Sequence, residues 1–392
     1  MKLSSRTQAF DRWIRTAFVE MNTELENRYF AQERRSDVLG CGDEIKLQLR
    51  DEGRAHVIEL LAEGNTGDGF DSAFSVLGNV GMYLAALRRH ELTNPARETR
   101  SPFLEASSLA LHVGASLGMA PRFATSHLAT RNRAVEGVRK SFTSLADEFI
   151  FIDENTRGIL LLQSAADALT TIVHLGASSP VADVPFAAAK RAVQDVIASN
   201  QRLAERLDVQ RFFYCVRPYY KPYRVGRQEY RGANAGDFSG INELDLLLGV
   251  CRANDPYYAQ LLVDKMLFML PADQARLREC MTRTSLLDEL LPLIDTCAHT
   301  DWFQQNARLY LETFDVYAQS AIQHHDILVK KFIEVPAGTL EEAALEGITA
   351  SGPPLSVLLG ALEILRDMRR AADRPDITSR YHDIARLRAA VH

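Results

Sequence analysis

Apolar residues recur along most of this chain at intervals of three and four positions, the spacing that gathers them on one face of an α-helix. Residues 190–207 follow this pattern, and residues 158–174 repeat it. Runs that alternate apolar and polar residues are short and rare. The pattern predicts an all-α fold, in which helices bury their apolar stripes against one another.

Irregular stretches interrupt the helical pattern and divide the chain. They lie at residues 92–101, 176–185, 217–240 and 335–354. The third stretch is too rich in glycine, proline and aromatic residues to form a single helix. The first stretch is the expected boundary between a small N-terminal helical domain, residues 1–100, and a larger helical domain, residues 101–392.

The clearest predicted helix spans residues 302–334, with an apolar stripe that runs from Phe303 to Phe332. His325 falls inside this stripe, whereas His324 is rotated about 100° away from it. A buried imidazole needs a hydrogen-bond partner or a metal. His325 is therefore either a core histidine with a hydrogen-bond partner or a ligand, for which a haem iron held by a rigid helix is one candidate.

Composition narrows the class of protein. The 392 residues are 46% hydrophobic and carry a formal net charge of -6, which argues against a nucleic-acid-binding surface. The five cysteines form no C-x-x-C pair, so neither a disulfide framework nor a structural zinc site is expected. There is no glycine-rich phosphate-binding loop. None of the ten histidines has a glutamate three positions before it, which disfavours a di-iron carboxylate site.

The sequence shows neither a membrane-spanning segment nor a signal peptide. No run of 18 or more apolar residues occurs, and residues 1–5 lead into a mixed polar segment without the apolar core of a signal peptide. We therefore expect a cytoplasmic protein that has no membrane or nucleic-acid partner.

Residues 217–232, RPYYKPYRVGRQEYRG, resemble a specific family. They match the run R-P-x-Y-x-P-x-R-V-G-x-Q-x-Y-x-G of the monodechloroaminopyrrolnitrin synthase family, whose namesake belongs to the pyrrolnitrin pathway. That family is part of the superfamily of indoleamine and tryptophan 2,3-dioxygenases. The resemblance implies an all-α bundle around haem b, and a haem-dependent oxygenase that acts on tryptophan or a similar aromatic amino acid.

The resemblance also assigns substrate-binding residues. Phe212-Phe213 and Arg217 are similar to the pattern F-F-x-x-x-R of indoleamine dioxygenase, in which two aromatic rings line the substrate pocket and the arginine binds the substrate carboxylate. A guanidinium suits that role because it makes two parallel hydrogen bonds to a carboxylate. Arg224 is a second candidate for the same role. A surface arginine above two core phenylalanines is the structural alternative.

Two further segments resemble the haem-binding parts of the superfamily. Asn234-Ala235-Gly236 is similar to a loop of small residues that passes beside the haem, although Asn234 stands where the family has serine. The segment from His325 to Ile333 resembles the tryptophan dioxygenase pattern H-x-x-M-V-x-R-x-I around the iron ligand. The resemblance therefore selects His325 as the ligand, the same histidine that lies in the apolar stripe.

The distal side of the implied haem pocket is matched by residues 117–132 and 158–164. Pocket-lining positions are Thr125 and Leu128, and the implied catalytic side chains are His127, Gln163 and Ser164. A solvent-facing helix residue is the alternative for His127. Thr349 lies in a Gly/Thr/Ser stretch that is similar to the loop closing over substrate in tryptophan dioxygenase, and it can equally belong to an ordinary linker.

The function implied is the oxidation of a small aromatic amino acid by dioxygen or peroxide, through oxygen addition to the C2–C3 edge of an indole. Ring cleavage and rearrangement are both open as outcomes, in secondary metabolism, and the protein can be a monomer or a homodimer. One rival hypothesis is a non-catalytic helical ligand-binding protein that keeps the fold without active haem. Another is an enzyme that uses a different metal on the same scaffold.

Overall fold

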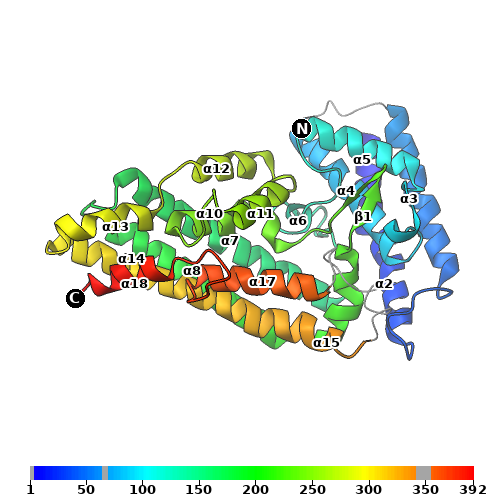
Figure 1. The fold of residues 1–392 in the computed structure, drawn as a ribbon. Coiled ribbons are helices and arrows are strands. Elements are labelled where there is room, and N and C mark those ends of the chain that lie inside the picture. Colours follow the sequence, from blue (N-terminus) through cyan, green and yellow to red (C-terminus); the bar gives the residue numbers. More distant parts are fainter. Residues whose placement is uncertain (1–3, 64–68, 341–354) are drawn as a thin grey trace. The chain divides into compact units, whose positions relative to one another are not determined.

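The computed structural model describes residues 4–63, 69–340 and 355–392, and nearly all regular structure in them is helical (Figure 1). The two strands in these residues are β1 (Tyr223–Val225) and β2 (Gln228–Tyr230), which pair as one antiparallel hairpin. The predicted all-α fold is confirmed.

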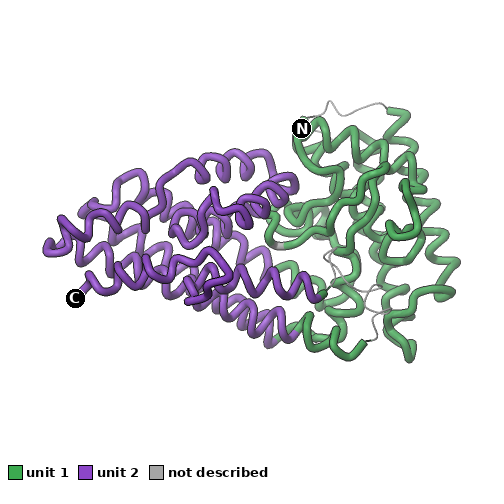
Figure 2. The backbone as a smooth tube through the Cα atoms, in the orientation of Figure 1, with its two compact units in different colours: residues 1–153, 206–237, 332–355 green, residues 154–205, 238–331, 356–392 purple. Residues whose placement is uncertain are grey.

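The chain divides into two compact units, each built from three separate stretches (Figure 2). Unit 1 contains residues 1–153, 206–237 and 332–355, and unit 2 contains residues 154–205, 238–331 and 356–392. The division falls within helix α7 and within π-helix η5, whose bounds follow below. It does not coincide with the domain boundary predicted at residue 100, which lies inside unit 1.

Unit 1 contains the first helices, the hairpin and several short helical turns. Its elements are α1 (Ser5–Arg15), α2 (Ala17–Phe30), α3 (Asp43–Glu63), α4 (Phe70–Arg89), η1 (Pro95–Arg97), α5 (Leu104–Leu117), α6 (Thr125–Leu128), α9 (Val209–Arg211), η2 (Phe212–Val216), η3 (Arg217–Tyr220), β1, β2, η4 (Ala235–Asp237) and α15 (Val335–Ala337). Helix α7 (Ala146–Leu175) begins in this unit.

Unit 2 contains the remaining long helices. Its elements are the rest of α7, α8 (Asp183–Arg206), α10 (Ser239–Leu248), α11 (Pro256–Met266), α12 (Pro271–Met281), α13 (Leu286–Cys297), α14 (Asp301–Gln323), most of η5 (His324–Glu334), α17 (Leu355–Arg369) and α18 (Tyr381–Ala389). Helices α7 and α8 confirm the predicted helices at 158–174 and 190–207. The predicted helix at 302–334 is α14 followed directly by η5, which is a π-helix.

Helix α4 is the centre of unit 1 and is buried on nearly all sides, as its apolar sequence requires. Two glycines let the segment around α6 approach it closely. A Cβ atom on Gly81 would lie 2.1 Å from the backbone nitrogen of Phe123, and one on Gly78 would lie 2.3 Å from the ring of His127. Glycine at these positions therefore sets the place of residues 123–128 against α4.

A buried ion pair connects α4 to α2 in the same unit. The guanidinium of Arg89 donates two hydrogen bonds of 2.7 Å to the carboxylate of Glu26, and both side chains are almost completely buried. Arg89 also donates to the carbonyl oxygen of Tyr214 at 2.9 Å. Because a buried charge is stable only when paired, this contact fixes η2 against the two helices.

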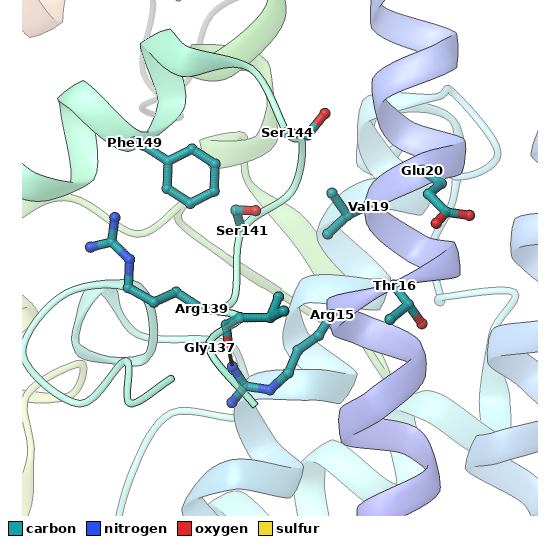
Figure 3. Close-up of a pocket in the computed structure, with 10 residues that line it drawn as sticks. Arg15, Thr16, Val19, Glu20, Gly137, Arg139, Ser141, Ser144 and Phe149 are labelled. Carbon is teal, nitrogen blue, oxygen red and sulfur yellow. Dashed lines mark hydrogen bonds between the residues drawn. The ribbon is translucent and has the colours of Figure 1, made fainter. Parts of the chain in front are cut away.

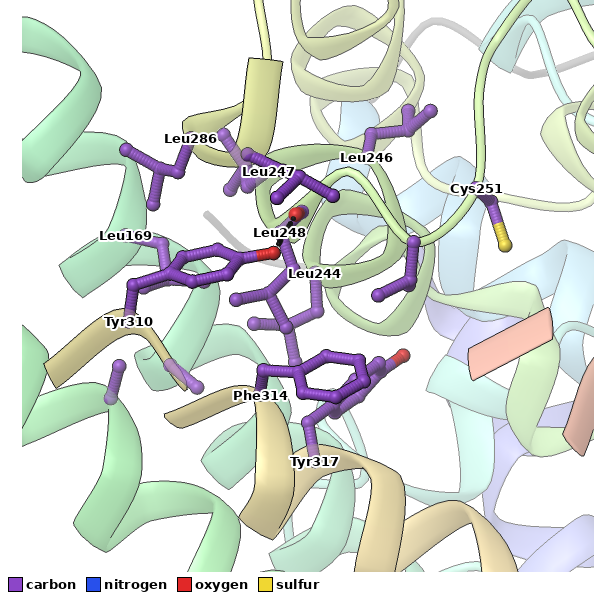
Figure 4. Close-up of a cluster of buried hydrophobic side chains, with 14 of the residues drawn as sticks. Leu169, Leu244, Leu246, Leu247, Leu248, Cys251, Leu286, Tyr310, Phe314 and Tyr317 are labelled. Atoms are coloured by element: carbon purple, nitrogen blue, oxygen red, sulfur yellow. Dashed lines mark hydrogen bonds between the residues drawn. The ribbon is translucent and has the colours of Figure 1, made fainter. Parts of the chain in front are cut away.

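The core of unit 2 gathers leucines of α10 against aromatic side chains of α14 (Figure 4). Leu244, Leu247 and Leu248 pack beside Phe314 and other members of this cluster. The hydroxyl of Tyr310 donates to the carbonyl oxygen of Leu248 at 2.7 Å. This hydrogen bond satisfies the buried hydroxyl, because burying a hydroxyl without a hydrogen-bond partner costs free energy.

Asp245 on α10 is a completely buried carboxylate that joins four helices of unit 2. It accepts hydrogen bonds from Tyr258 on α11 at 2.7 Å and from Tyr317 on α14 at 2.6 Å. Arg369 on α17 binds the same carboxylate through Nε at 2.9 Å and Nη2 at 2.8 Å. The carboxylate also raises the pKa of both tyrosines, after burial itself.

By length and composition alone, α4 and α7 are apolar enough to cross a membrane. Most of the apolar window of α4 is buried inside the protein, which is typical of a core helix, while the corresponding window of α7 is less buried. Core helices of soluble proteins pass the same test, so the two helices are weak evidence for a membrane.

Asp245→Asn should strongly destabilise the protein, because the charge of Arg369 stays buried without a carboxylate. We expect a loss of about 3–5 kcal/mol in the free energy of unfolding, measured by urea denaturation followed by circular dichroism. The control is Asp195→Asn on the exposed side of α8, which should change the value by less than about 0.5 kcal/mol. Equal effects of the two substitutions would contradict the role given to Asp245.

Candidate functional site

The predicted substrate-binding segment lies in unit 1 and begins with a π-helical turn. Phe212 and Phe213 are the first residues of η2 (Phe212–Val216), and Arg217 is the first residue of the 3₁₀ turn η3. π-Helical turns are rare and occur frequently at functional sites. The change of helix type turns successive side chains of this segment in directions that a regular α-helix would not allow.

Both phenylalanines are buried among aromatic rings. The ring of Phe212 lies 4.9 Å from that of Phe151 and 5.8 Å, edge to face, from that of Phe332. Phe213 is fully buried and packs with Ala337 and its neighbours. These contacts hold the two rings rigidly.

Arg217 is buried as well, with only 5% of its surface exposed. Its guanidinium carbon lies 5.5 Å from the centre of the Phe213 ring. Burial lowers the pKa of Arg217 to about 10, which shows how costly the charge is in this environment. The structure thus excludes the surface arginine considered as the alternative and presents a desolvated cation beside aromatic rings.

Arg224, the second candidate for carboxylate binding, serves the hairpin instead. It donates to the carbonyl oxygens of Arg227 at 2.6 Å and Pro95 at 3.2 Å, and its guanidinium lies 3.6 Å from Glu229. Gly226, with φ of +61°, allows the turn between the strands. The second half of the family motif therefore builds a hairpin, and the geometry does not favour Arg224 as a substrate ligand.

The loop of small residues and the predicted pocket residue Thr125 come together in unit 1. The Thr125 hydroxyl donates to the carbonyl oxygen of Asn234 at 2.7 Å. The Asn234 side chain accepts from the backbone N–H of Gly236 at 2.8 Å, and Ala235 begins the 3₁₀ turn η4. Asn234, which stands where the family has serine, therefore makes a hydrogen bond within the loop. Leu128, the other predicted pocket residue, is buried in the same unit.

An ion-pair cluster that the sequence analysis missed holds this loop. The carboxylate of Asp237 lies 2.8 Å from Arg122 and 2.7 Å from Arg231, and it accepts the N–H of Asn234 at 3.2 Å. Arg122 is 1% exposed and lies 115 positions from Asp237 in the chain. Nothing in a single sequence relates two such distant residues.

His127 is a core histidine with both ring nitrogens bonded to backbone groups. Nδ1 accepts the N–H of Ala124 at 2.8 Å, and Nε2 lies 2.8 Å from the carbonyl oxygen of Phe74, to which it donates as the neutral tautomer. The ring stacks on Phe74 with centroids 3.8 Å apart. Burial lowers the pKa of His127 to about 3. This geometry speaks against a catalytic proton at His127 and also against the solvent-facing alternative.

Gln163 and Ser164 lie on α7 in unit 2. The amide nitrogen of Gln163 donates to Asp167 at 3.3 Å, and its amide oxygen accepts from the hydroxyl of Ser239 at 3.4 Å. Gly240 allows α10 to approach the backbone of Gln163. Ser164 is exposed, so its hydroxyl is available, whereas Gln163 is oriented by its two partners.

His325 lies in unit 2 at the beginning of the π-helix η5, with 19% of its side chain exposed. Its Nδ1 atom is 3.0 Å from the carboxylate of Asp326 and 3.2 Å from Nη1 of Arg366. Nε2 has no hydrogen-bond partner within residues 4–63, 69–340 and 355–392. His324 has an exposed surface in the structure, yet the surrounding protein lowers its pKa to about 4, mainly through burial.

Within the described residues, no group of three or more His, Cys, Asp or Glu side chains could hold a metal ion. A haem iron needs only a single axial side chain from the protein. The contact of Nδ1 with Asp326 suits such a ligand, whereas the contact of the same atom with Arg366 requires a lone pair on Nδ1.

Two pockets among the described residues lie away from the predicted site residues. One of about 420 Å³ in unit 1 is lined by Arg15, Arg139, Phe149 and neighbouring residues (Figure 3). Another of about 380 Å³ in unit 2 is lined by residues near Cys251 and Asp288. None of the predicted site residues lines either pocket. Thr349 lies outside the described residues.

These observations define the class of the protein: an all-α protein with a partly buried histidine beside a carboxylate and, separately, an aromatic cluster beside a buried arginine. A family comparison identifies it further. The chain belongs to the monodechloroaminopyrrolnitrin synthase PrnB family, whose model matches residues 4–391. The resemblance read from residues 217–232 is confirmed, and the protein is a member of an enzyme family of secondary metabolism.

The environment of His127 predicts a defined dependence of stability on pH. Unfolded histidine binds a proton below its usual pKa of about 6.5, whereas the folded protein resists this down to about 3. The stability contributed by neutral His127 is therefore complete above pH 6.5 and is lost as the pH falls toward 3. The stability advantage of the parent over His127→Gln should shrink across this range by up to about 1.4 kcal/mol per pH unit.

Urea denaturation of parent and variant at pH 7.5, 5.5 and 4.5 measures this difference. The control is His299→Gln, which changes an exposed histidine and should show no comparable trend. A difference between parent and His127→Gln that stays constant with pH would argue that the ring is not buried as a neutral group.

Proposed function

We propose that the protein is a haem-dependent oxygenase that acts on tryptophan or a tryptophan-like aromatic amino acid. The observation that carries the proposal is the environment of His325, which turns Nδ1 toward Asp326 and leaves Nε2 without a hydrogen-bond partner among the described residues. Histidines that bind metals through Nε2 commonly donate Nδ1–H to a carboxylate. Membership of the PrnB family supports the same conclusion.

Haem b, when bound, supplies the iron chemistry that activates dioxygen or peroxide. His325 would hold the iron, and Asn234, Ala235 and Gly236 would belong to the haem-binding loop, as the resemblance implies. The hydrogen bond between the Asn234 side chain and the N–H of Gly236 supports that role, because it fixes the conformation of the loop.

Arg217 is proposed to bind the carboxylate of the substrate, and Phe212 and Phe213 to pack against its ring. A guanidinium binds a carboxylate through two parallel hydrogen bonds, so we propose a free amino acid rather than a bare indole as the substrate. Thr125 and Leu128 are proposed to line the pocket. The reaction would add oxygen to the C2–C3 edge of the indole, followed by ring cleavage or rearrangement.

Of the three side chains that the resemblance assigns to catalysis, two keep a polar group that could contact dioxygen. His127 has no ring nitrogen available, so the polar side chains proposed to interact with dioxygen are Gln163 and Ser164. Ser164, being exposed, can accept or donate a hydrogen bond without breaking an existing one. A cytoplasmic location and a monomeric or homodimeric state complete the proposal.

His325→Ala should abolish the axial ligand while leaving the fold intact. We expect haem-supplemented parent protein to show an intense Soret band in the ferric, ferrous and CO-bound forms, and the variant to lose or shift it. The matched control is His324→Ala, one position earlier in the same helix, which should keep the spectrum of the parent.

A colourless parent protein after haem supplementation would overturn the haem proposal and favour a non-catalytic ligand-binding protein. A Soret band that changes in His324→Ala and not in His325→Ala would identify His324 as the ligand and overturn the assignment to His325. Metal content without a porphyrin band would indicate the alternative metal enzyme.

Arg217→Ala should weaken tryptophan binding by about 10- to 100-fold, the cost of losing hydrogen bonds to a charged group. Binding of tryptamine, which lacks the carboxylate, should change little. Calorimetric titration of both ligands measures this, with Arg227→Ala in the exposed hairpin turn as control. An equal loss for the two ligands would show that Arg217 supports the pocket rather than the carboxylate.

A further inference from the structure

Two charged side chains compete for one nitrogen atom of His325. Oδ1 of Asp326, on the same helix, lies 3.0 Å from Nδ1, and Nη1 of Arg366, on α17, lies 3.2 Å from it. All three residues belong to unit 2. Neither Asp326 nor Arg366 was indicated by the sequence patterns.

The two contacts require opposite states of Nδ1. A guanidinium can only donate a hydrogen bond, so contact with Arg366 requires a lone pair on Nδ1. An ionised carboxylate can only accept, so contact with Asp326 requires a proton on Nδ1. A neutral imidazole carries one proton, and therefore the first contact places it on Nε2 whereas the second leaves Nε2 with a lone pair.

We propose that Asp326 and Arg366 are positioning residues that decide which nitrogen of His325 carries the proton. With Arg366 on Nδ1, Nε2 is protonated and cannot bind iron. When Arg366 moves to Asp326, Nδ1–H donates to the carboxylate and the lone pair of Nε2 is ready for a ligand bond. This inference rests on the proposed role of His325.

The required movement of Arg366 is small. Its Nη1 atom is already 4.0 Å from Oδ1 of Asp326. The rest of the guanidinium is tethered, by Nε to Asp367 at 2.9 Å and by Nη2 to Glu363 at 3.3 Å. These tethers keep Nη1 between its two partners, so a modest rotation exchanges one for the other.

The exchange also stabilises the ligating form electrostatically. Arg366 beside Asp326 places a positive charge next to the carboxylate that accepts Nδ1–H. The result is a carboxylate–histidine pair of the kind that orients metal-binding imidazoles. The carboxylate of Asp326 is exposed to solvent. Without Arg366, water would compete with Nδ1–H for the hydrogen bond to this carboxylate.

The first test uses the full chain without haem, because the tautomer of His325 can be measured before any ligand binds. Two-bond ¹H–¹⁵N correlation spectra of ¹⁵N-histidine-labelled protein distinguish the two tautomers, and His325→Ala assigns the signal. Arg366→Ala should move the population toward Nδ1–H, and Asp326→Asn should move it toward Nε2–H. Arg366→Lys, which keeps a donor, should resemble the parent.

The second test measures haemin binding and the vibration of the iron–histidine bond in the ferrous protein. Asp326→Asn should weaken haemin binding about 10-fold and lower the stretching frequency, as loss of a carboxylate partner does. The control is Asp315→Asn on α14, an exposed acid paired with Arg388, which should leave both quantities unchanged. Melting curves of every variant verify that the fold is retained.

The two proposals fail in different ways. A tautomer population that neither Arg366→Ala nor Asp326→Asn changes overturns this inference, even if the parent binds haem through His325. A parent protein that binds no haem, while the tautomer responds as expected, overturns the proposed function and leaves the competition at Nδ1 in place.

Discussion

Several charged side chains inside this protein are buried as ion pairs, and the way the helices meet depends on these pairs. Asp245 with Arg369 joins helices of unit 2, and Glu26 with Arg89 joins helices of unit 1. An unpaired charge in such a place would cost several kcal/mol, so each pair forces two distant segments together. Apolar periodicity alone specifies helices, but it does not specify which helices meet.

The candidate functional segments are attached to these pairs. Arg89 binds the carbonyl of Tyr214 in the turn that carries Phe212 and Phe213, and Asp237 holds the loop that follows the hairpin. In unit 2, Asp245 binds Tyr317, two turns before His325 on the same helical rod. The buried charged residues therefore position the segments proposed to be functional, although they have no proposed role in the reaction.

Both proposed functional helices change to π geometry where their important residues lie. The helical period of the sequence predicted one regular helix through residues 302–334, and the structure changes helix type at His324. The same change occurs at Phe212. A π-helical segment shifts the direction of every later side chain, which the sequence pattern could not show, because it is stabilised by packing around it rather than by local preference.

The sequence by itself determined the all-α class, the positions of the long helices and the family, because these follow from local periodicity and from one contiguous motif. Only the tertiary structure decided that both nitrogens of His127 are bonded, that Arg224 serves a hairpin, and that Arg122 meets Asp237. It also decided the composition of the two units, each assembled from three stretches. The physical reason is that the partner of a buried polar group can lie a hundred positions away, and a residue type does not reveal its partner.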